Sequence, residues 1–150
     1  MGLETVGLRY FNVFGPRQDP KSQYSAVIPL FITAGMEGRR PTIYGDGLQT
    51  RDFTYVANNV QANILAATTT KNVSGKIINI ACGTSFSVLD LLKAVNEALG
   101  KKIEPIFAPA RKGDVKHSLA DISLARELLG YEVEVDFPEG IHRTVDCIKR

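Results

Sequence analysis

Short apolar runs of strand length alternate along this chain with segments in which apolar residues recur at helical spacing. Strands that alternate with helices predict the α/β class rather than a helix bundle. A length of 150 residues suits one domain with a sizeable core. The expected strands are residues 5–14, 41–44, 53–56, 76–81 and 103–108, and the expected helices are residues 25–36, 60–67, 87–99, 121–129 and 138–148.

Capping residues predict where several helices begin. Ser87, with Asp90 three residues later, has the form of a capping box in which aspartate replaces the usual glutamate. Asn58 or Asn59 is expected to cap the helix over residues 60–67, and Asp121 is expected to cap the short helix over residues 121–129. These signals are local, so they predict helix starts without reference to the rest of the fold.

Residues 45–56 combine a glycine turn, an Arg-Asp pair and an aromatic, β-branched run. Gly45 and Gly47 permit a tight turn, and Arg51 offers a planar fork of donors that matches two oxygens of a phosphate. Asp52 is expected to pair with this guanidinium group and to hold it in one orientation. The competing interpretation, which spacing alone favours, is a surface ion pair beside a turn that contributes little.

Polar side chains also follow other expected strands. Asn12 lies at the end of the first run, and Arg111 and Asp114 follow the run over residues 103–108. In open α/β sheets, ligands collect where strand ends and loops converge. Two arginines in one cleft would neutralise a diphosphate, and an aspartate beside them would accept from a sugar hydroxyl. Spacing alone does not show that Arg51 and Arg111 meet.

Composition argues against several classes of function. The net charge of +2 is too small to indicate nucleic acid or a membrane surface, and no apolar run approaches the roughly 18 residues of a membrane span. Cys82 and Cys147 are too few for a disulfide framework, so a reducing compartment and a cytoplasmic protein are expected. Together with His117 and His142 they show no metal-ligand spacing, and no metal site is predicted.

The common catalytic motifs are missing from the sequence. It contains no Gly-x-x-x-x-Gly-Lys-Ser/Thr loop, no Gly-x-Gly-x-x-Gly loop, no Tyr-x-x-x-Lys pair and no Gly-x-Ser-x-Gly elbow. The sequence therefore predicts polar binding groups and no catalytic residue.

Four stretches in matched order and spacing resemble the extended short-chain dehydrogenase/reductases that act on nucleotide-sugars, the NAD-dependent epimerase/dehydratase family. The likeness runs through nearly all of the chain but covers only the C-terminal half of such an enzyme. It implies a substrate-binding part with short strands alternating with helices, in which residues 1–150 form a single nucleotide-sugar-binding domain and the Rossmann half is absent. A strand-like run that begins at Thr5 also suggests a fragment of a larger unit. The four stretches are residues 9–17, 43–53, 79–89 and 111–114.

Within this family, Gln18 and the stretches 24–29 and 113–118 are most similar to UDP-N-acetylglucosamine 4-epimerases. The resemblance implies that Asn12 contacts the substrate near its phosphates and sugar, that Arg51 and Arg111 bind the diphosphate, and that Asp114 binds the ribose hydroxyls. Uridine would lie against Val27, Thr42 and Tyr44, with Thr84 beside it. The N-acetylated hexose would face Gln18 and Ser118, and the nicotinamide would lie toward Tyr10 and Phe11.

Each of these residues also has a structural interpretation. Without the resemblance, Tyr10 and Phe11 are better explained as core residues, and Tyr44 as a sheet residue that packs on its neighbours. Gln18 is equally suited to a solvated loop, and Ser118 to the edge of a strand. The two interpretations differ in whether the side chains meet in one cavity.

The resemblance implies a UDP-sugar-binding half of an NAD-dependent 4-epimerase that is inactive alone, with NAD as the cofactor of the complete enzyme. A fragment of a 4,6-dehydratase or of a UDP-glucuronate decarboxylase shares most of the motifs. Two further alternatives are a non-catalytic UDP-sugar-binding module and a truncated product that self-associates. The expected partners are the UDP-sugar and a separately encoded Rossmann half, and a homodimer is left open.

Overall fold

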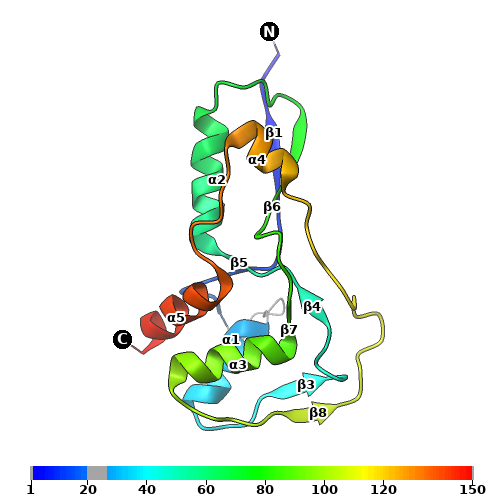
Figure 1. Ribbon diagram of the computed structural model, residues 1–150, viewed down its shortest axis with the longest axis vertical. Coiled ribbons are helices and arrows are strands. Elements are labelled where there is room, and N and C mark those ends of the chain that lie inside the picture. Colours follow the sequence, from blue (N-terminus) through cyan, green and yellow to red (C-terminus); the bar gives the residue numbers. More distant parts are fainter. Residues whose placement is uncertain (1, 20–26, 150) are drawn as a thin grey trace.

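The structure is a computed structural model, and it describes residues 2–19 and 27–149 (Figure 1). Helices and strands alternate along the chain, which confirms the predicted α/β class. In chain order the elements are β1 Val6–Tyr10, β2 Val13–Phe14, α1 Val27–Met36, β3 Thr42–Tyr44, β4 Thr50–Arg51, β5 Thr54–Tyr55, α2 Val56–Thr68, β6 Lys76–Ile80, β7 Phe86–Ser87, α3 Val88–Leu99, β8 Ile106–Ala108, α4 Ser123–Leu129 and α5 Phe137–Ile148.

The first part of the fold is a parallel pair of strands covered by two helices. β1 runs beside β6 with Val6 opposite Lys76 and Tyr10 opposite Ile80. α2 and α4 pack on this pair and lie with it in the upper part of the view in Figure 1. Their buried side chains form one apolar group, which we call the upper cluster. Its members are Ala62, Ile78, Ile80, Ala81, Ala120, Ile122, Ala125, Leu129 and Tyr131.

The second part surrounds α3, which contacts both α1 and α5 (Figure 1). β3 pairs with β8 in parallel, with Thr42 opposite Ile106 and Tyr44 opposite Ala108. The apolar side chains buried here form the lower cluster, in which Phe137 stacks on Phe53 and Phe86. The other buried members are Phe14, Ile28, Phe31, Ile32, Ile43, Tyr55, Val88, Leu91, Leu92, Ala94, Val95, Val135, Ile141 and Val145.

The helix signals of the sequence hold at α3. Ser87 Oγ accepts from the backbone N–H of Asp90 at 3.0 Å, and Asp90 Oδ2 accepts from the backbone N–H of Ser87 at 2.9 Å, which confirms the capping box. The Ser87 hydroxyl also donates to Asp90 Oδ2 at 2.6 Å, and this bond, together with the one from the Ser87 backbone N–H, holds the pKa of Asp90 below its usual value. Gly100 ends the helix at φ +64°, in the left-handed region that glycine adopts without strain.

The expected cap at Asn58 or Asn59 is wrong. α2 begins at Val56, so both asparagines lie inside its first turn, and Asn58 is fully buried. The run over residues 53–56 is only a two-residue strand, because the chain turns directly from Tyr55 into the helix. The run over residues 5–14 is also interrupted: Asn12 has φ +34° and separates β1 from β2.

The helix expected over residues 25–36 corresponds to α1, and Pro29 lies in its first turn as predicted. Residues 25 and 26 of the expected helix, and residues 24–26 of the stretch 24–29, lie outside the described residues. No helix in residues 2–19 and 27–149 is long and apolar enough to cross a membrane.

Candidate functional site

A cavity of about 690 Å³ lies between α1, β3, β4 and the loop that follows β8. Apolar side chains of α1 and β3 line it together with arginines and two acidic residues. A mixture of apolar walls and a few convergent polar groups is typical of a small-molecule site. Seven residues that the sequence singles out line this cavity: Asn12, Val27, Thr42, Tyr44, Arg51, Arg111 and Asp114.

Arg111 lies over the ring of Tyr44. Its guanidinium carbon is 3.9 Å from the centre of the ring, which is the geometry of a cation–π contact. Tyr44 is the last residue of β3, and its strand partner is Ala108 at the end of β8. Parallel pairing of these two strands therefore brings the loop that carries Arg111 to the end of the strand that carries Tyr44.

Arg51 pairs with Asp114, not with its neighbour Asp52. Arg51 Nη2 lies 2.6 Å from Asp114 Oδ1, and Arg51 Nη1 donates to the carbonyl oxygen of Thr50 at 2.8 Å. The side chain of Arg51 is 19% exposed and that of Asp114 40% exposed, so the pair lies at the cavity wall. The sequence predicted that both groups belong to one site but assigned them separate contacts.

Asp52 is buried and turns away from the cavity. Its carboxylate accepts from the backbone N–H groups of Cys82 and Gly83, each at 2.9 Å, and from that of Ala120 at 3.4 Å. Consecutive side chains of an extended segment point to opposite sides, so Arg51 and Asp52 diverge although they are neighbours. Burial raises the pKa of the Asp52 carboxyl group, and the three N–H donors partly offset this shift.

Asn12 lies at the rim of the cavity in a left-handed backbone conformation. Its Nδ2 donates to the carbonyl oxygen of Asp52 at 3.1 Å, and its own carbonyl oxygen accepts from the N–H of Thr54 at 3.2 Å. Asparagine adopts this conformation more readily than most side chains. Asn12 thus joins the end of β1 to the segment that carries Arg51.

Gln18, Thr84 and Ser118 are not among the residues that line this cavity. Gln18 Nε2 donates to the carbonyl oxygen of Val13 at 3.5 Å, and its Oε1 is buried without a hydrogen-bond partner among the described residues. Thr84 is exposed, and Ser118 is half-buried with its N–H on the carbonyl oxygen of Thr50. Their contacts with a substrate stay predictions.

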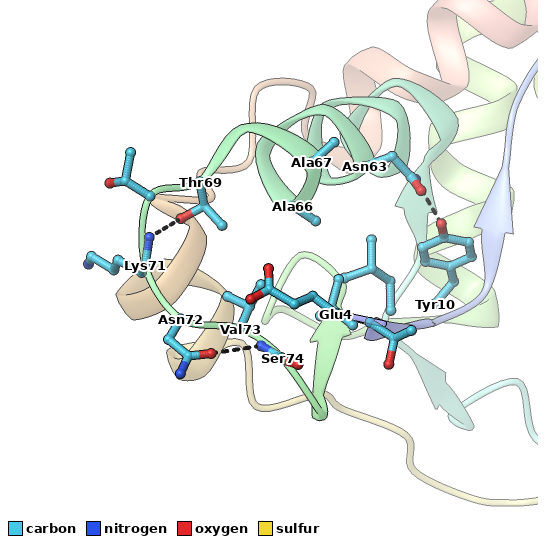
Figure 2. A pocket seen from close by; sticks show the side chains of 14 residues that line it. Glu4, Tyr10, Asn63, Ala66, Ala67, Thr69, Lys71, Asn72, Val73 and Ser74 are labelled. Atoms are coloured by element: carbon cyan, nitrogen blue, oxygen red, sulfur yellow. Dashed lines mark hydrogen bonds between the residues drawn. The ribbon is translucent and has the colours of Figure 1, made fainter. Parts of the chain in front are cut away.

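Tyr10 and Phe11 lie away from this cavity. The Tyr10 hydroxyl accepts from Asn63 Nδ2 at 2.7 Å, and Tyr10 lines a second cavity of about 890 Å³ between β1 and α2 (Figure 2). Phe11 is half-buried against the upper cluster. Neither side chain forms part of a phosphate cradle, and their contact with nicotinamide stays a prediction. Among the described residues, no group of three or more His, Cys, Asp or Glu side chains could hold a metal ion.

Sequence reasoning missed several side chains of the site. Leu30 and Phe31 of α1, with Phe53 and Val88, supply much of its apolar wall. Gln49 also lines the cavity and fixes the end of β3 by donating from Nε2 to the carbonyl oxygen of Tyr44 at 2.8 Å. The sequence predicted a helix over residues 25–36, but this largely apolar segment gave no signal for which of its residues face a cavity rather than the core.

Cys82 is expected to resist alkylation. Burial, with the nearby Asp52 charge as a smaller cause, raises the pKa of its thiol to about 11. At pH 8 iodoacetamide should modify Cys82 on the order of 100-fold more slowly than the exposed Cys147, since only the thiolate reacts. Mass spectrometry of peptides over time measures both rates, and the difference should vanish in denaturant. Equal rates in the folded protein would contradict the shifted pKa.

Comparison with known proteins gives a consistent result. A putative UDP-glucose 4-epimerase of Methanocaldococcus jannaschii is 40% identical over 99% of this chain and 47% of its own length. The solved UDP-glucose 4-epimerase of Thermotoga maritima, with UDP-glucose, is 38% identical with a TM-score of 0.91, and the match covers 98% of this chain and 46% of that one. The UDP-N-acetylglucosamine 4-epimerase of Methanobrevibacter ruminantium, in complex with UDP-N-acetylmuramic acid, is 44% identical with a TM-score of 0.90, over 98% and 46%.

The chain thus spans about half the length of the relatives it matches. Those relatives modify nucleotide-sugars, and decarboxylases and 4,6-dehydratases are found among them beside the epimerases. Their shared fold confirms the predicted partial short-chain dehydrogenase/reductase architecture. Residues 1–81 match the NAD dependent epimerase/dehydratase family, as the sequence resemblance predicted, and the chain belongs to that family.

Proposed function

We propose that the chain binds UDP-sugars in the cavity between α1, β3 and the loop after β8, with Arg51 and Arg111 on the diphosphate. The observation that carries this proposal is the convergence of two guanidinium groups, sixty residues apart in sequence, on the wall of one cavity. A bidentate guanidinium contact is a strong charge-assisted interaction for phosphate oxygens.

The apolar part of the same cavity suits the uracil base and its ribose. Val27, Thr42 and Tyr44 line it beside Arg111, and the aromatic face of Tyr44 is already in contact with that arginine. A flat base can pack against apolar and aromatic side chains while the phosphates reach the two arginines. The relatives from Thermotoga maritima and Methanobrevibacter ruminantium bind UDP-sugars, which supports this assignment.

The wider proposal is that residues 1–150 form the substrate-binding domain of a 4-epimerase, which a dinucleotide-binding half completes. NAD is the cofactor of the full-length family, and solved relatives contain it. The residues described here would not hold that cofactor by themselves, because the sequence has no glycine-rich phosphate loop. We therefore assign no catalytic step to this chain alone.

The surface that would receive the other half lies at β1 and α2. Among the described strands β1 pairs only with β6, so one of its edges is free. α2 contains no charged residue and exposes Val60 (54%) and Ile64 (58%). The cavity in Figure 2 lies between these two elements. A free parallel edge beside an uncharged helix face suits a partner that adds a strand and packs a helix.

Calorimetric titration with UDP tests the binding proposal. Arg51→Ala and Arg111→Ala should each weaken UDP binding by about 1.5–3 kcal/mol, the worth of a hydrogen bond to a charged group. Arg143→Ala is the matched control. It removes the same charge, but Arg143 pairs with Glu139 on the exposed side of α5. If UDP affinity is unchanged in both cavity variants, the two arginines do not bind the diphosphate and make only ordinary surface contacts.

Turnover separates the half-enzyme from the alternatives. With UDP-N-acetylglucosamine and NAD, the chain alone should form no UDP-N-acetylgalactosamine, and product should appear only when a dinucleotide-binding half is added. Product from the chain alone would refute the proposed division of labour. UDP binding without turnover even after that half is added would favour a non-catalytic module, and a mass of twice the monomer would favour a homodimer.

A further inference from the structure

The loop over residues 109–116 carries two charged groups of the cavity on one turn. The backbone N–H of Asp114 donates to the carbonyl oxygen of Arg111 at 3.3 Å, and Gly113 between them has φ +84°. This left-handed glycine reverses the chain, so that Arg111 and Asp114 both reach the cavity while every residue of the loop is exposed.

Two side-chain contacts hold this loop against the cavity. Arg111 stacks on Tyr44 of β3, and Asp114 pairs with Arg51 of β4 at 2.6 Å. The flanks are fixed by backbone bonds: Gly45 donates to Ala108 and Thr50 donates to Lys116, both at 2.8 Å. Between these anchors, the Arg51–Asp114 ion pair is one of the two side-chain contacts that join the loop to the cavity wall, among the described residues.

The two arginines differ in their present partners. Arg51 gives Nη1 to the carbonyl oxygen of Thr50 and Nη2 to the carboxylate of Asp114. Arg111, within the part of the chain that the structure describes, faces an aromatic ring and forms no ion pair. A phosphate can therefore approach Arg111 directly, whereas at Nη2 of Arg51 it meets a carboxylate already in place.

We propose that Asp114 is a specificity-determining residue that competes with anionic ligands for Arg51 and so selects ligands carrying hydroxyl groups beside their phosphates. This inference rests on the proposed UDP-sugar site. A phosphate that takes Arg51 displaces the carboxylate, which then needs new donors because an unpaired anion beside a phosphate is unfavourable. Neighbouring sugar hydroxyls can supply those donors, but inorganic pyrophosphate cannot.

Inorganic pyrophosphate and UDP are the probes that test this inference. In Asp114→Asn the competing charge is gone, and pyrophosphate should bind about five- to tenfold more tightly, whereas UDP should gain nothing or lose affinity. The ratio of UDP affinity to pyrophosphate affinity should therefore fall by at least about fivefold. Asp146→Asn, on the exposed side of α5, makes the same change in net charge and should leave the ratio unaltered.

Limited trypsin digestion gives an independent readout without any ligand. Cleavage after Arg111, Lys112 and Lys116 should be several times faster in Asp114→Asn than in the wild-type chain, because the loop has lost one of its two side-chain anchors, while circular dichroism stays unchanged. Equal cleavage rates would show that the ion pair does not hold the loop, and would overturn the inference.

The binding outcomes distinguish this inference from the function it rests on. If the wild-type chain binds UDP but Asp114→Asn binds pyrophosphate no better, the competitive role of Asp114 is wrong and the UDP-sugar site stands. If neither the wild-type chain nor any variant binds UDP, the proposed site itself is wrong and the inference falls with it.

Discussion

Asp52→Asn is expected to lower the free energy of unfolding by about 2–4 kcal/mol, because it removes a charged acceptor and leaves at least one buried N–H donor unpaired. The wild-type carboxylate accepts three backbone N–H groups, from Cys82, Gly83 and Ala120. The amide of asparagine keeps one acceptor oxygen but turns its NH₂ group toward N–H donors. At least one buried donor is then left without a partner, and two segments distant in sequence lose their common anchor.

Urea unfolding followed by circular dichroism measures this loss. Asp46→Asn is the matched control, since Asp46 accepts a single N–H, that of Leu48, in an exposed turn. The control should lose less than about 1 kcal/mol, the usual worth of one exposed bond. If Asp52→Asn lowers the free energy of unfolding no more than Asp46→Asn does, the three hydrogen bonds of Asp52 do not stabilise the fold.

The second large effect is expected for Asn58→Ala, at about 2–4 kcal/mol, since it leaves the buried N–H and carbonyl groups of Val135 without their partners. Asn58 Nδ2 donates to the carbonyl oxygen of Val135 at 2.7 Å, and Asn58 Oδ1 accepts from the N–H groups of Glu134 and Val135, each at 3.1 Å. The asparagine thus ties the first turn of α2 to the segment that leads into α5. The gain in helix propensity from alanine offsets only about 0.6 kcal/mol of the loss.

Asn63→Ala provides the comparison on the same helix. Asn63 is exposed, and its Nδ2 donates to the Tyr10 hydroxyl and to the carbonyl oxygen of Asn59. Its loss should cost less than about 1 kcal/mol because water can replace both contacts. Equal midpoints of urea unfolding for Asn58→Ala and Asn63→Ala would show that the buried hydrogen bonds of Asn58 add nothing to stability.

Asp52 and Asn58 also show where sequence reasoning failed. Asp52 was expected to pair with Arg51, and Asn58 was a candidate helix cap, because both interpretations considered only near neighbours. Their actual partners lie 24 to 77 residues away. The capping box at Ser87 and the glycine at Gly100 were predictable, since each depends on a backbone turn within a few residues of itself.

The candidate site also combines features that the sequence predicts with features that depend on the tertiary fold. The sequence suggested Arg51 and Arg111 as phosphate ligands from their chemistry, but the tertiary fold brings them to one cavity. β3 pairs with β8, and β4 is joined to the end of the loop by the bond from the Thr50 N–H to Lys116. Gln18, Thr84 and Ser118 were grouped with them by resemblance, and the structure places them elsewhere, so their roles stay predictions. Residue type was readable from sequence, whereas the direction of each side chain depended on the tertiary fold.

The placement of the charged loop has a consequence for how such proteins diverge. Arg51 is fixed by a strand, while Arg111 and Asp114 sit on an exposed turn that contributes nothing to either buried cluster. Mutations in this turn can therefore retune ligand preference at almost no thermodynamic penalty to the scaffold. On the proposed site, selection acting on this turn would alter which anionic groups the protein admits while leaving the free energy of folding almost unchanged.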